Sequence, residues 1–410
     1  MNLRVAVVAP AVGLALVCAR DGRAAGIALD VQSGRGTGMA GAVTAMIDDS
    51  SSIFYNPAGI AQGKLVDVQI GDSLILPSFQ YTSPSNVSTN NSLQPVPPFQ
   101  VYYSGGVTDD LSIGIGVFTP YGLTLAWPPG WAGKSLIVQS SLATYDFNPT
   151  VAYRFGPLRV GAGLQVVRAT VDLQRKIETG AAEASTELGA AAWGVGGNAG
   201  VQVDAVPQYL TLGLHYRSAV SFNFDGNAHF DGVPLPLASV LHDQRVTTSL
   251  TTPHSLQMAA ASRPMKSLVL DLDVVWYNWS TFRSLDIHFP NDATGTLSTS
   301  QAKNWHDTVN VHVGGELELD PSWRVRAGVL YDPTPSPGDT LTPDLPDSDR
   351  VNLAVGGSYL HPSGFRVDLG YQLLFILKKT STAVTFPGDY SGTVNIIGIS
   401  VGYRTPGRAM

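Results

Sequence analysis

The feature that most constrains this chain is an alternation of apolar residues with small or polar ones, which dominates the sequence from about residue 64 onward. In residues 308–319, TVNVHVGGELEL, every second residue from Val309 onward is apolar or glycine, and the residues between them are mostly polar. The segments WRVRAGVLYD (323–332) and FRVDLGYQLLF (365–375) repeat the pattern. A period of two places alternate side chains on opposite faces of a β-strand, so we expect long strands whose two faces meet different surroundings.

The scarcity of charge indicates what the apolar face meets. Charged residues make up 14% of the 410 residues, against about 25% in soluble domains. A soluble β-sandwich is the alternative, but the water-facing side of its strands would carry many more lysines and glutamates. An apolar outer face with a lumen face of glycine, small polar and occasional charged residues is typical of a transmembrane barrel. The predicted fold is therefore an all-β, antiparallel transmembrane β-barrel.

The connections between the strands predict their number. Six short turns alternate with seven long segments rich in polar residues, glycine or proline, so the connections join fourteen strands within residues 64–410. Bacterial barrels place short turns in the periplasm and long loops outside the cell, so both ends of the barrel are expected on the periplasmic side. Turns are expected near 108–110, 156–157, 206–208, 263–266, 320–321 and 361–364, and loops near 81–96, 120–138, 177–188, 225–246, 284–303, 333–349 and 379–392.

The first residues predict export. Residues 1–25 have a basic start, an apolar run over 5–19, and Ala24 and Ala25 at the end, which is typical of a secretory signal peptide. Cys18 could instead be a lipoprotein acceptor, but Val17 before it is a poor fit to the small residue required there. No later apolar run reaches the roughly 18 residues of a membrane-spanning helix. The net charge of −7 argues against nucleic-acid partners.

Residues 26–63 have a different composition from the barrel. Glycine, alanine and serine are dense, and the alternation is absent. Within SSIFYNPAGIA (51–61), Asn56 is placed to cap a short helix, Pro57 suits its first turn, and Ala58 follows. The segment is too small to fold alone, so we expect it to form a hatch, a plug of short helices inside the lumen.

A proline interrupts the third predicted strand. Residues 112–123, SIGIGVFTPYGL, begin as a strand and then place Pro120 between Phe118 and Gly122. Proline has no N–H for a sheet ladder, so it bends a strand or ends it, and glycine relaxes the backbone further. One interpretation is a kink that opens the barrel wall at these three residues; the other is that Pro120 merely ends the strand at the extracellular rim.

The segment after this proline carries large apolar side chains outside the cell. In YGLTLAWPPGWAG (121–133), the candidates for capturing a hydrophobic ligand are Leu123, Leu125, Trp127 and Trp131. Exposed apolar groups at such a place predict a binding groove. The alternatives are an interfacial girdle and a loop packed on itself.

Several motifs spread over almost the whole chain point to one family. They are GRGTGMAGAVTAMIDDSSSIFYNPAGIA, GVFTPYGLTLAWPPGWAG, WYNWSTF, NWHDT, WRVRAGVLYDPTP and PDLPDSDRVNLAVGGSYL. Taken together and in this order, they resemble the FadL family of outer-membrane channels for hydrophobic compounds. The resemblance implies an outer-membrane barrel with a hatch containing Asn56, Pro57 and Ala58, and a third strand whose kink releases ligand sideways into the membrane. It further implies fatty acids, alkanes or aromatic hydrocarbons as partners, together with outer-membrane lipid, and we expect a monomer.

One charged residue is a candidate for a ligand contact inside the barrel. Along LQVVRATVDLQ (164–174) the apolar residues change phase, and a bulge near Val166 and Val167 would explain this by turning Arg168 inward. Arg168 could then meet a ligand carboxylate, although pairing with an aspartate of the lumen is an alternative.

The sequence contains no motif that predicts catalysis, and we expect no cofactor and no metal. His254 and Ser255 could form a nucleophile pair in an outer-membrane lipid hydrolase, but neighbours in a strand point to opposite faces. A water-filled diffusion pore is the remaining alternative to passive uptake of hydrophobic compounds.

Overall fold

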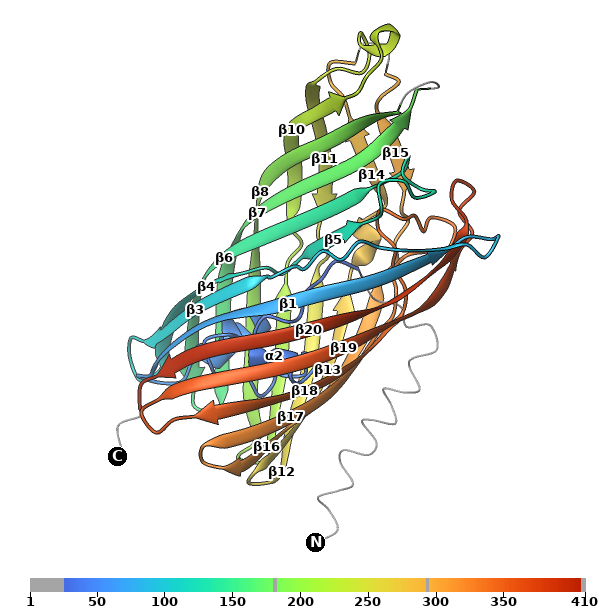
Figure 1. Cartoon of the computed structure of the whole chain (residues 1–410). Helices are drawn as coiled ribbons and strands as arrows, with labels where there is room; N and C mark the ends of the chain where they lie inside the picture. Colours follow the sequence, from blue (N-terminus) through green and yellow to red (C-terminus); the bar gives the residue numbers. More distant parts are fainter. Residues whose placement is uncertain (1–25, 180–182, 293–294, 407–410) are drawn as a thin grey trace.

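Alternation along the chain produces a closed antiparallel barrel in the computed structural model, which describes residues 26–179, 183–292 and 295–406 (Figure 1). Fourteen strands make the wall, several of them in two pieces. In order they are β1 (Val66–Thr82), β3 (Phe99–Gly106), β4 (Leu111–Phe118) with β5 (Gly122–Ala126), β6 (Gln139–Phe155), β7 (Leu158–Glu178), β8 (Glu183–Val206), β9 (Leu210–Arg217) with β10 (Ser221–Asp231), β11 (Gln244–Thr251) with β12 (Ser255–Met265), β13 (Leu268–Tyr277) with β14 (Ser284–His288), β15 (Thr299–Ala302) with β16 (Thr308–Asp320), β17 (Trp323–Asp332), β18 (Arg350–Leu360), β19 (Phe365–Ser381) and β20 (Gly388–Arg404).

The first and last strands close the barrel. β1 pairs with β20 from Asp67↔Arg404 to Thr82↔Asp389, and the short β2 (Ser88–Asn90) folds back on the end of β1. Thirteen connections join these strands, and both barrel ends lie on the side of the six predicted turns, so the predicted fold and strand count are confirmed. The predicted signal peptide, residues 1–25, lies outside the described residues. No helix of the described part is long and apolar enough to cross a membrane.

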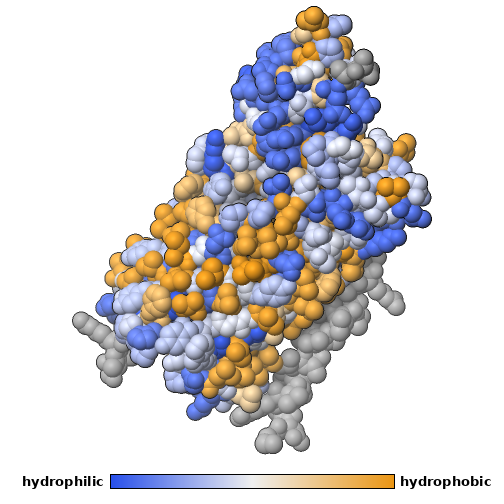
Figure 2. All heavy atoms as spheres, viewed as in Figure 1, coloured by the Kyte–Doolittle hydropathy of each residue, from blue (hydrophilic) through white to orange (hydrophobic). Residues whose placement is uncertain are grey.

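The outer surface separates into an apolar and a polar part. Figure 2 shows apolar atoms gathered over the lower and middle part of this face and mainly hydrophilic atoms on the upper projection. Large apolar side chains that are exposed on the strands include Ile70, Ile113, Ile115, Val151, Leu164, Leu214, Val313, Val329, Val355, Leu369 and Ile399. A monomeric soluble protein rarely exposes so many, and lipid contact explains them.

Six predicted loops are wrong in part, because strands continue into them. β5 lies within 120–138, β7 reaches Glu178 and β8 begins at Glu183, and strands likewise enter 81–96, 225–246, 284–303 and 379–392. In these extensions the outer face is polar, with Thr170, Asp172 and Gln174 on β7, and the inner face is apolar. A polar outer face hides the strand from a search for lipid-facing alternation.

Residues 26–63, called the hatch below, lie inside the barrel (Figure 1). They contain α2 (Gly34–Thr37), α3 (Ser52–Tyr55) and the 3-10 helix η1 (Pro57–Ile60). Asn56 caps η1 by accepting a hydrogen bond from the Ala58 N–H at 3.2 Å, and Pro57 occupies its first turn, as predicted. The Asn56 amide also donates to the carbonyl of Val201 in β8, 3.1 Å away, which ties the hatch to the wall.

Glycines on the lumen face let the hatch approach the wall. A Cβ on Gly200 of β8 would lie 2.0 Å from Asn56 Oδ1 and 2.8 Å from Pro57 Cδ. We expect Gly200→Ala to lower the unfolding free energy by about 1–3 kcal/mol, because the well-packed hatch has to shift. Gly197→Ala on the same strand is the control, since its added Cβ would lie 3.5 Å from the Gly163 carbonyl oxygen, an ordinary contact. Equal unfolding temperatures of the two variants would contradict this account.

Ion pairs hold the body of the hatch at the periplasmic end. Arg35 of α2 lies 2.7 Å from Asp48, 3.2 Å from Asp49 and 3.1 Å from Glu316 of β16. Further pairs extend this network, called the clamp below, around the wall: Arg326 with Glu316 and Asp368, Arg366 with Asp368 and Asp67, and Arg404 with Asp67. Although burial opposes it, the Arg35 guanidinium lowers the pKa of Asp48 below its usual range. The Asp48 carboxylate is therefore held in the charged form.

Candidate ligand cavity and wall opening

The third barrel strand is kinked at Pro120. β4 and β5 both pair with β6, but residues 119–121 stand opposite only residues 144–145. The strand resumes as β5, so Pro120 interrupts it rather than ending it. Phe118, just before the kink, is fully buried against Phe54 of the hatch, with ring centroids 5.3 Å apart.

The wall is unpaired beyond this kink. β3 pairs with β4 as far as Val101↔Val117, and that register continued by three residues would set Pro98 opposite Pro120. The residues before β3 read PVPP (95–98), so prolines without N–H groups border the wall on both sides. Within the described residues, β5 forms a ladder with β6 alone, and its other side faces residues 91–98 through one isolated bridge, Ser92↔Ala126. Sequence reasoning missed these prolines, although the PVPP run before an alternating strand was the available signal.

The N-terminal end of the hatch pairs with the kink. The Leu29 N–H donates to the Pro120 carbonyl at 3.0 Å, and the Gly122 N–H donates to the Ile27 carbonyl at 2.9 Å. Ala28 and Tyr121 form an antiparallel bridge between these two bonds. The Leu29 side chain packs over Gly122, whose added Cβ would lie 3.0 Å from Leu29 Cδ1. Residues 27–29 therefore take the place of the missing neighbour strand and satisfy backbone groups that lipid could not.

An apolar cavity of about 130 Å³ lies behind this pairing. It extends from the gap in the wall, at Val96 and Gly122, to β17 and β18 on the other side. Its lining residues are Gly26, Ala28, Leu29, Asp30, Val31, Ile75, Pro77, Phe79, Val96, Gly122, Leu123, Thr124, Leu330, Asp332, Arg350, Asn352, Gln372, Leu374, Ile376, Val394 and Ile396. Aliphatic side chains predominate, and four of the six polar residues lie on β17, β18 and β19, the others being Asp30 of the hatch and Thr124 of β5.

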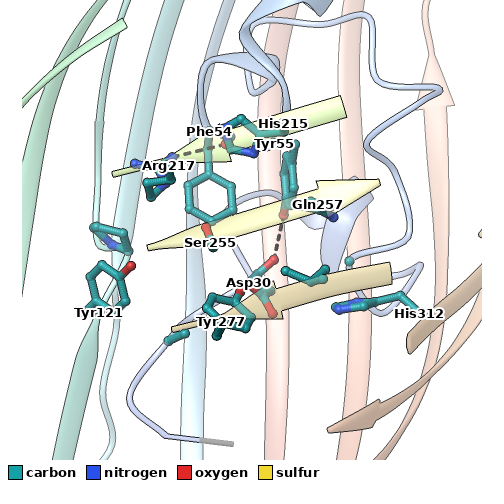
Figure 3. A pocket seen from close by; sticks show the side chains of 14 residues that line it. Asp30, Phe54, Tyr55, Tyr121, His215, Arg217, Ser255, Gln257, Tyr277 and His312 are labelled. Atoms are coloured by element: carbon teal, nitrogen blue, oxygen red, sulfur yellow. Dashed lines mark hydrogen bonds between the residues drawn. The ribbon is translucent and has the colours of Figure 1, made fainter. Parts of the chain in front are cut away.

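A smaller polar cavity of about 30 Å³ lies beside the N-terminal end of the hatch (Figure 3). Tyr121, Arg217 and His215 border it, and Ala28 and Asp30 line both cavities. The dashed lines in Figure 3 mark the Tyr55 hydroxyl donating to the Asp30 carbonyl at 2.9 Å and Arg217 donating to the Phe54 carbonyl at 3.2 Å. Burial raises the pKa of the Tyr55 hydroxyl, which keeps it a donor. The polar cavity has room for about one water molecule.

The predicted capture residues form a roof rather than an exposed groove. Trp127 stacks on Trp131 with ring centroids 4.5 Å apart, and its indole N–H donates to the Pro343 carbonyl at 3.1 Å. Leu125, Trp127 and Trp131 are at most 4% exposed, so the prediction that they present an apolar surface to the outside is wrong. They pack against the loop at 333–349, which folds inward, as a self-packed loop would. Leu123 instead lines the apolar cavity.

Arg168 lies on the outside of the barrel, so the prediction that it turns inward is wrong. β6 and β7 keep one register on both sides of the expected bulge, with Phe147↔Val166 and Thr150↔Gly163. The Arg168 guanidinium packs over the exposed Trp193 ring, 5.5 Å from its centroid. The apolar residues change phase because the lumen becomes apolar at this height, not because the strand bulges.

The candidate nucleophile pair is separated by the barrel wall. His254 Nδ1 accepts a hydrogen bond from the Ala219 N–H at 3.2 Å and lies 2.7 Å from the Tyr216 hydroxyl. Ser255 is buried and lines the polar cavity of the lumen. The two side chains lie on opposite faces, as expected for neighbours in a strand, and cannot act together.

Comparison with known proteins identifies relatives along the whole barrel. A sequence profile described as "Outer membrane protein transport protein (OMPP1/FadL/TodX)" matches residues 15–405. The chain is 25% identical over 408 residues to the long-chain fatty acid transport protein of Escherichia coli K12, covering 88% of this chain and 90% of that protein. It is 26% identical over 403 residues to a 47 kDa outer membrane protein of Pasteurella multocida, covering 91% and 92%.

Solved structures share the fold. A FadL homologue of Pseudomonas aeruginosa superimposes with a TM-score of 0.80 at 18% identity, covering 92% of this chain and 99% of that one. The toluene transporter TbuX of Ralstonia pickettii superimposes with a TM-score of 0.71 at 18% identity, covering 91% of this chain and 99% of that one. At these identities the likeness extends to the architecture alone.

Proposed function

Because this chain belongs to the family of outer-membrane transport proteins described as OMPP1/FadL/TodX, we propose that it takes up hydrophobic molecules passively and releases them sideways through the gap beside Pro120. Relatives named for transport of long-chain fatty acids and of toluene support a hydrophobic cargo. The observation that carries the proposal is the apolar cavity that reaches from the lumen to the unpaired edge of β5.

Lateral release suits the energetics of such a cargo. A hydrophobic molecule that re-enters water loses about 0.8 kcal/mol of favourable transfer free energy for each buried CH₂. A path from the apolar cavity directly into lipid avoids this loss. The prolines on both sides of the gap keep the neighbouring wall strands from pairing there, so no ladder between two wall strands has to break when ligand passes.

The hatch has two parts with different roles in this mechanism. The clamp holds residues 35–49 to the barrel, so the body of the hatch stays in the lumen as a plug. Residues 27–29 are joined to the kink by two backbone hydrogen bonds and leave it when ligand passes. Ligand enters from outside by displacing the roof above the apolar cavity, formed by Trp127, Trp131 and the loop at 333–349.

Uptake by cells tests the proposal against its alternatives. In a Gram-negative host that lacks its own transporters of this family, we expect expression of this chain to raise accumulation of a labelled hydrocarbon or fatty acid severalfold. Uptake of a labelled disaccharide should stay unchanged. Equal increases for both would favour a general pore, and no increase for any hydrophobic compound would contradict the proposal. Release of fatty acid from a lipid ester by the purified protein would favour a hydrolase.

A further inference from the structure

We infer that the apolar cavity selects an uncharged molecule of about one aromatic ring that carries a hydroxyl group, and that it rejects carboxylates. This inference rests on the proposed function and names the class of ligand that its cavity takes. It follows from three properties of the cavity: its one cation is already paired, its polar wall has atoms without hydrogen-bond partners, and its volume is that of one aromatic ring.

The only cation among the lining residues is already engaged by carboxylates. Arg350 donates to Asp347 at 2.7 Å and to the Gly26 carbonyl at 3.0 Å, and it lies 3.8 Å from Asp332. Asp30 and Asp332 both line the cavity. A ligand carboxylate would therefore meet a cation that Asp347 already pairs, with the carboxyl groups of Asp30 and Asp332 beside it. In an apolar setting, a carboxylate without a free cation to pair with keeps the full cost of its desolvation.

The polar wall instead offers hydrogen-bonding atoms that lack partners. Asp332 Oδ1, Asn352 Oδ1 and Gln372 Oε1 are buried without a hydrogen bond, and so is Arg350 Nε. The residues Asp332, Asn352 and Gln372 are 8%, 4% and 3% exposed. Either amide can turn to present its nitrogen, and the Asp332 carboxyl accepts when ionised and can also donate when protonated. A hydroxyl both donates and accepts, so it matches Asp332 Oδ1 and Arg350 Nε without adding charge.

The opposite wall fits a hydrocarbon and sets the orientation of the ligand. Ile75, Phe79, Val96, Leu123, Val394 and Ile396 line this side. Val96 and Leu123 border the gap, so the apolar end of the ligand points toward the lipid and the hydroxyl toward β17 and β18. The ligand is thus oriented to leave with its apolar end first.

The volume of the cavity sets the size of the ligand. A cavity of about 150 Å³ lined by apolar side chains binds benzene in another protein, and this one measures about 130 Å³. A single substituted ring fits, whereas a long acyl chain fits only after residues 27–29 of the hatch or the roof have moved. The simplest ligand of the inferred class is a phenol.

Three probes of nearly equal shape test the inference: p-cresol, p-xylene and p-toluate. We expect titration calorimetry of the full mature chain in detergent at neutral pH to give p-cresol the lowest Kd, at least tenfold below that of p-toluate, with p-xylene between them. Equal or tighter binding of p-toluate would overturn the inference. So would failure of p-cresol to bind while cells still accumulate hydrocarbons. Failure of cells to take up any hydrophobic compound would instead overturn the proposed function.

Variants at Asp332 test its hydrogen-bonding group. Asp332→Asn keeps a polar group of the same shape that can still accept, so p-cresol should still bind more tightly than p-xylene and p-toluate. Asp332→Leu removes the polar group, and p-cresol should lose its advantage over p-xylene. Asp109→Asn, in an exposed periplasmic turn, is the matched control and should keep the wild-type ranking. Should either Asp332 variant fail to fold, the ranking of the three probes on the wild-type chain still decides.

Discussion

Cysteines placed at Ala28 and Tyr121 should form a disulfide that lowers uptake at least tenfold until a reductant is added. The two residues form an antiparallel bridge flanked by the hydrogen bonds of Leu29 with Pro120 and of Gly122 with Ile27. Bridges of this kind hold the two Cα atoms about 4.5 Å apart, within the range of roughly 4.4–6.8 Å that a disulfide spans. The disulfide would fix residues 27–29 of the hatch over the gap and block lateral release.

Comparison of the oxidised and reduced double variant isolates the effect of the bond. Both states lack the Tyr121 hydroxyl, which contributes a contact of 3.5 Å to the Pro253 carbonyl, so that loss cancels. The chain's one cysteine, Cys18, lies in the predicted signal peptide, so no other thiol of the mature chain competes. The single variants Ala28→Cys and Tyr121→Cys should transport equally with and without reductant. Full uptake by a chain proven to be cross-linked would exclude movement of residues 27–29 as a step of transport.

The sequence predicts the wall of this protein far better than its interior. A period of two and the alternation of short and long connections depend on local chemistry, so the strands could be counted without knowing their partners. The cap at Asn56 and the turn at Pro57 are local as well, and both were predicted correctly. The extensions of the strands above the membrane were missed because water removes the apolar outer face that marked the strands below.

Arg168 and the roof residues show why the interior is harder to predict. Alternation reveals that a strand has two faces but not which face is outside, and the lumen turns apolar at Val167 and Ala169. The burial of Trp127 depends on the loop around Pro343, more than 200 residues later in the chain. Such contacts are set by the closure of the barrel, and no local pattern encodes them.

The two ends of the hatch are held by contacts of different strength, which explains how a plugged barrel can transport without losing its plug. Charged contacts gather at the periplasmic end of the hatch, where Arg35 joins hatch carboxylates to the wall, whereas residues 27–29 are joined to the kink by backbone hydrogen bonds and apolar contacts. Breaking a buried ion network leaves uncompensated charge, whereas a neutral hydrogen bond contributes only about 0.5–1.5 kcal/mol. Movement should therefore begin at the N-terminal end and stop at the clamp.

Acid should loosen the clamp only below the usual carboxyl range. The Asp48 pKa is lowered in the folded chain, so the carboxylate stabilises the hatch fully above its unfolded pKa of about 3.9 and loses this contribution as the pH falls through the lowered value. The pKa of Asp49 is lowered as well, because Arg366 and Arg35 outweigh the effect of burial, which would raise it. Asp49 therefore responds to acid in the same direction as Asp48. The hatch should stay seated at neutral and mildly acidic pH.

Removing the guanidinium at the centre of the clamp should have the largest effect on stability. Arg35→Met keeps much of the side-chain volume but leaves Asp48, Asp49 and Glu316 short of a partner, so we expect a loss of about 3 kcal/mol or more in unfolding free energy. The hatch should then leave its seat, and planar-bilayer conductance should rise. Lys64→Met is the control. The side chains of Lys64 and its partner Asp109 are 64% and 75% exposed, and exposed ion pairs contribute only about 0–1 kcal/mol to the unfolding free energy. Because Arg35 joins two hatch carboxylates to the wall, an Arg35 variant as stable and as closed as the Lys64 variant would mean that packing alone retains the hatch.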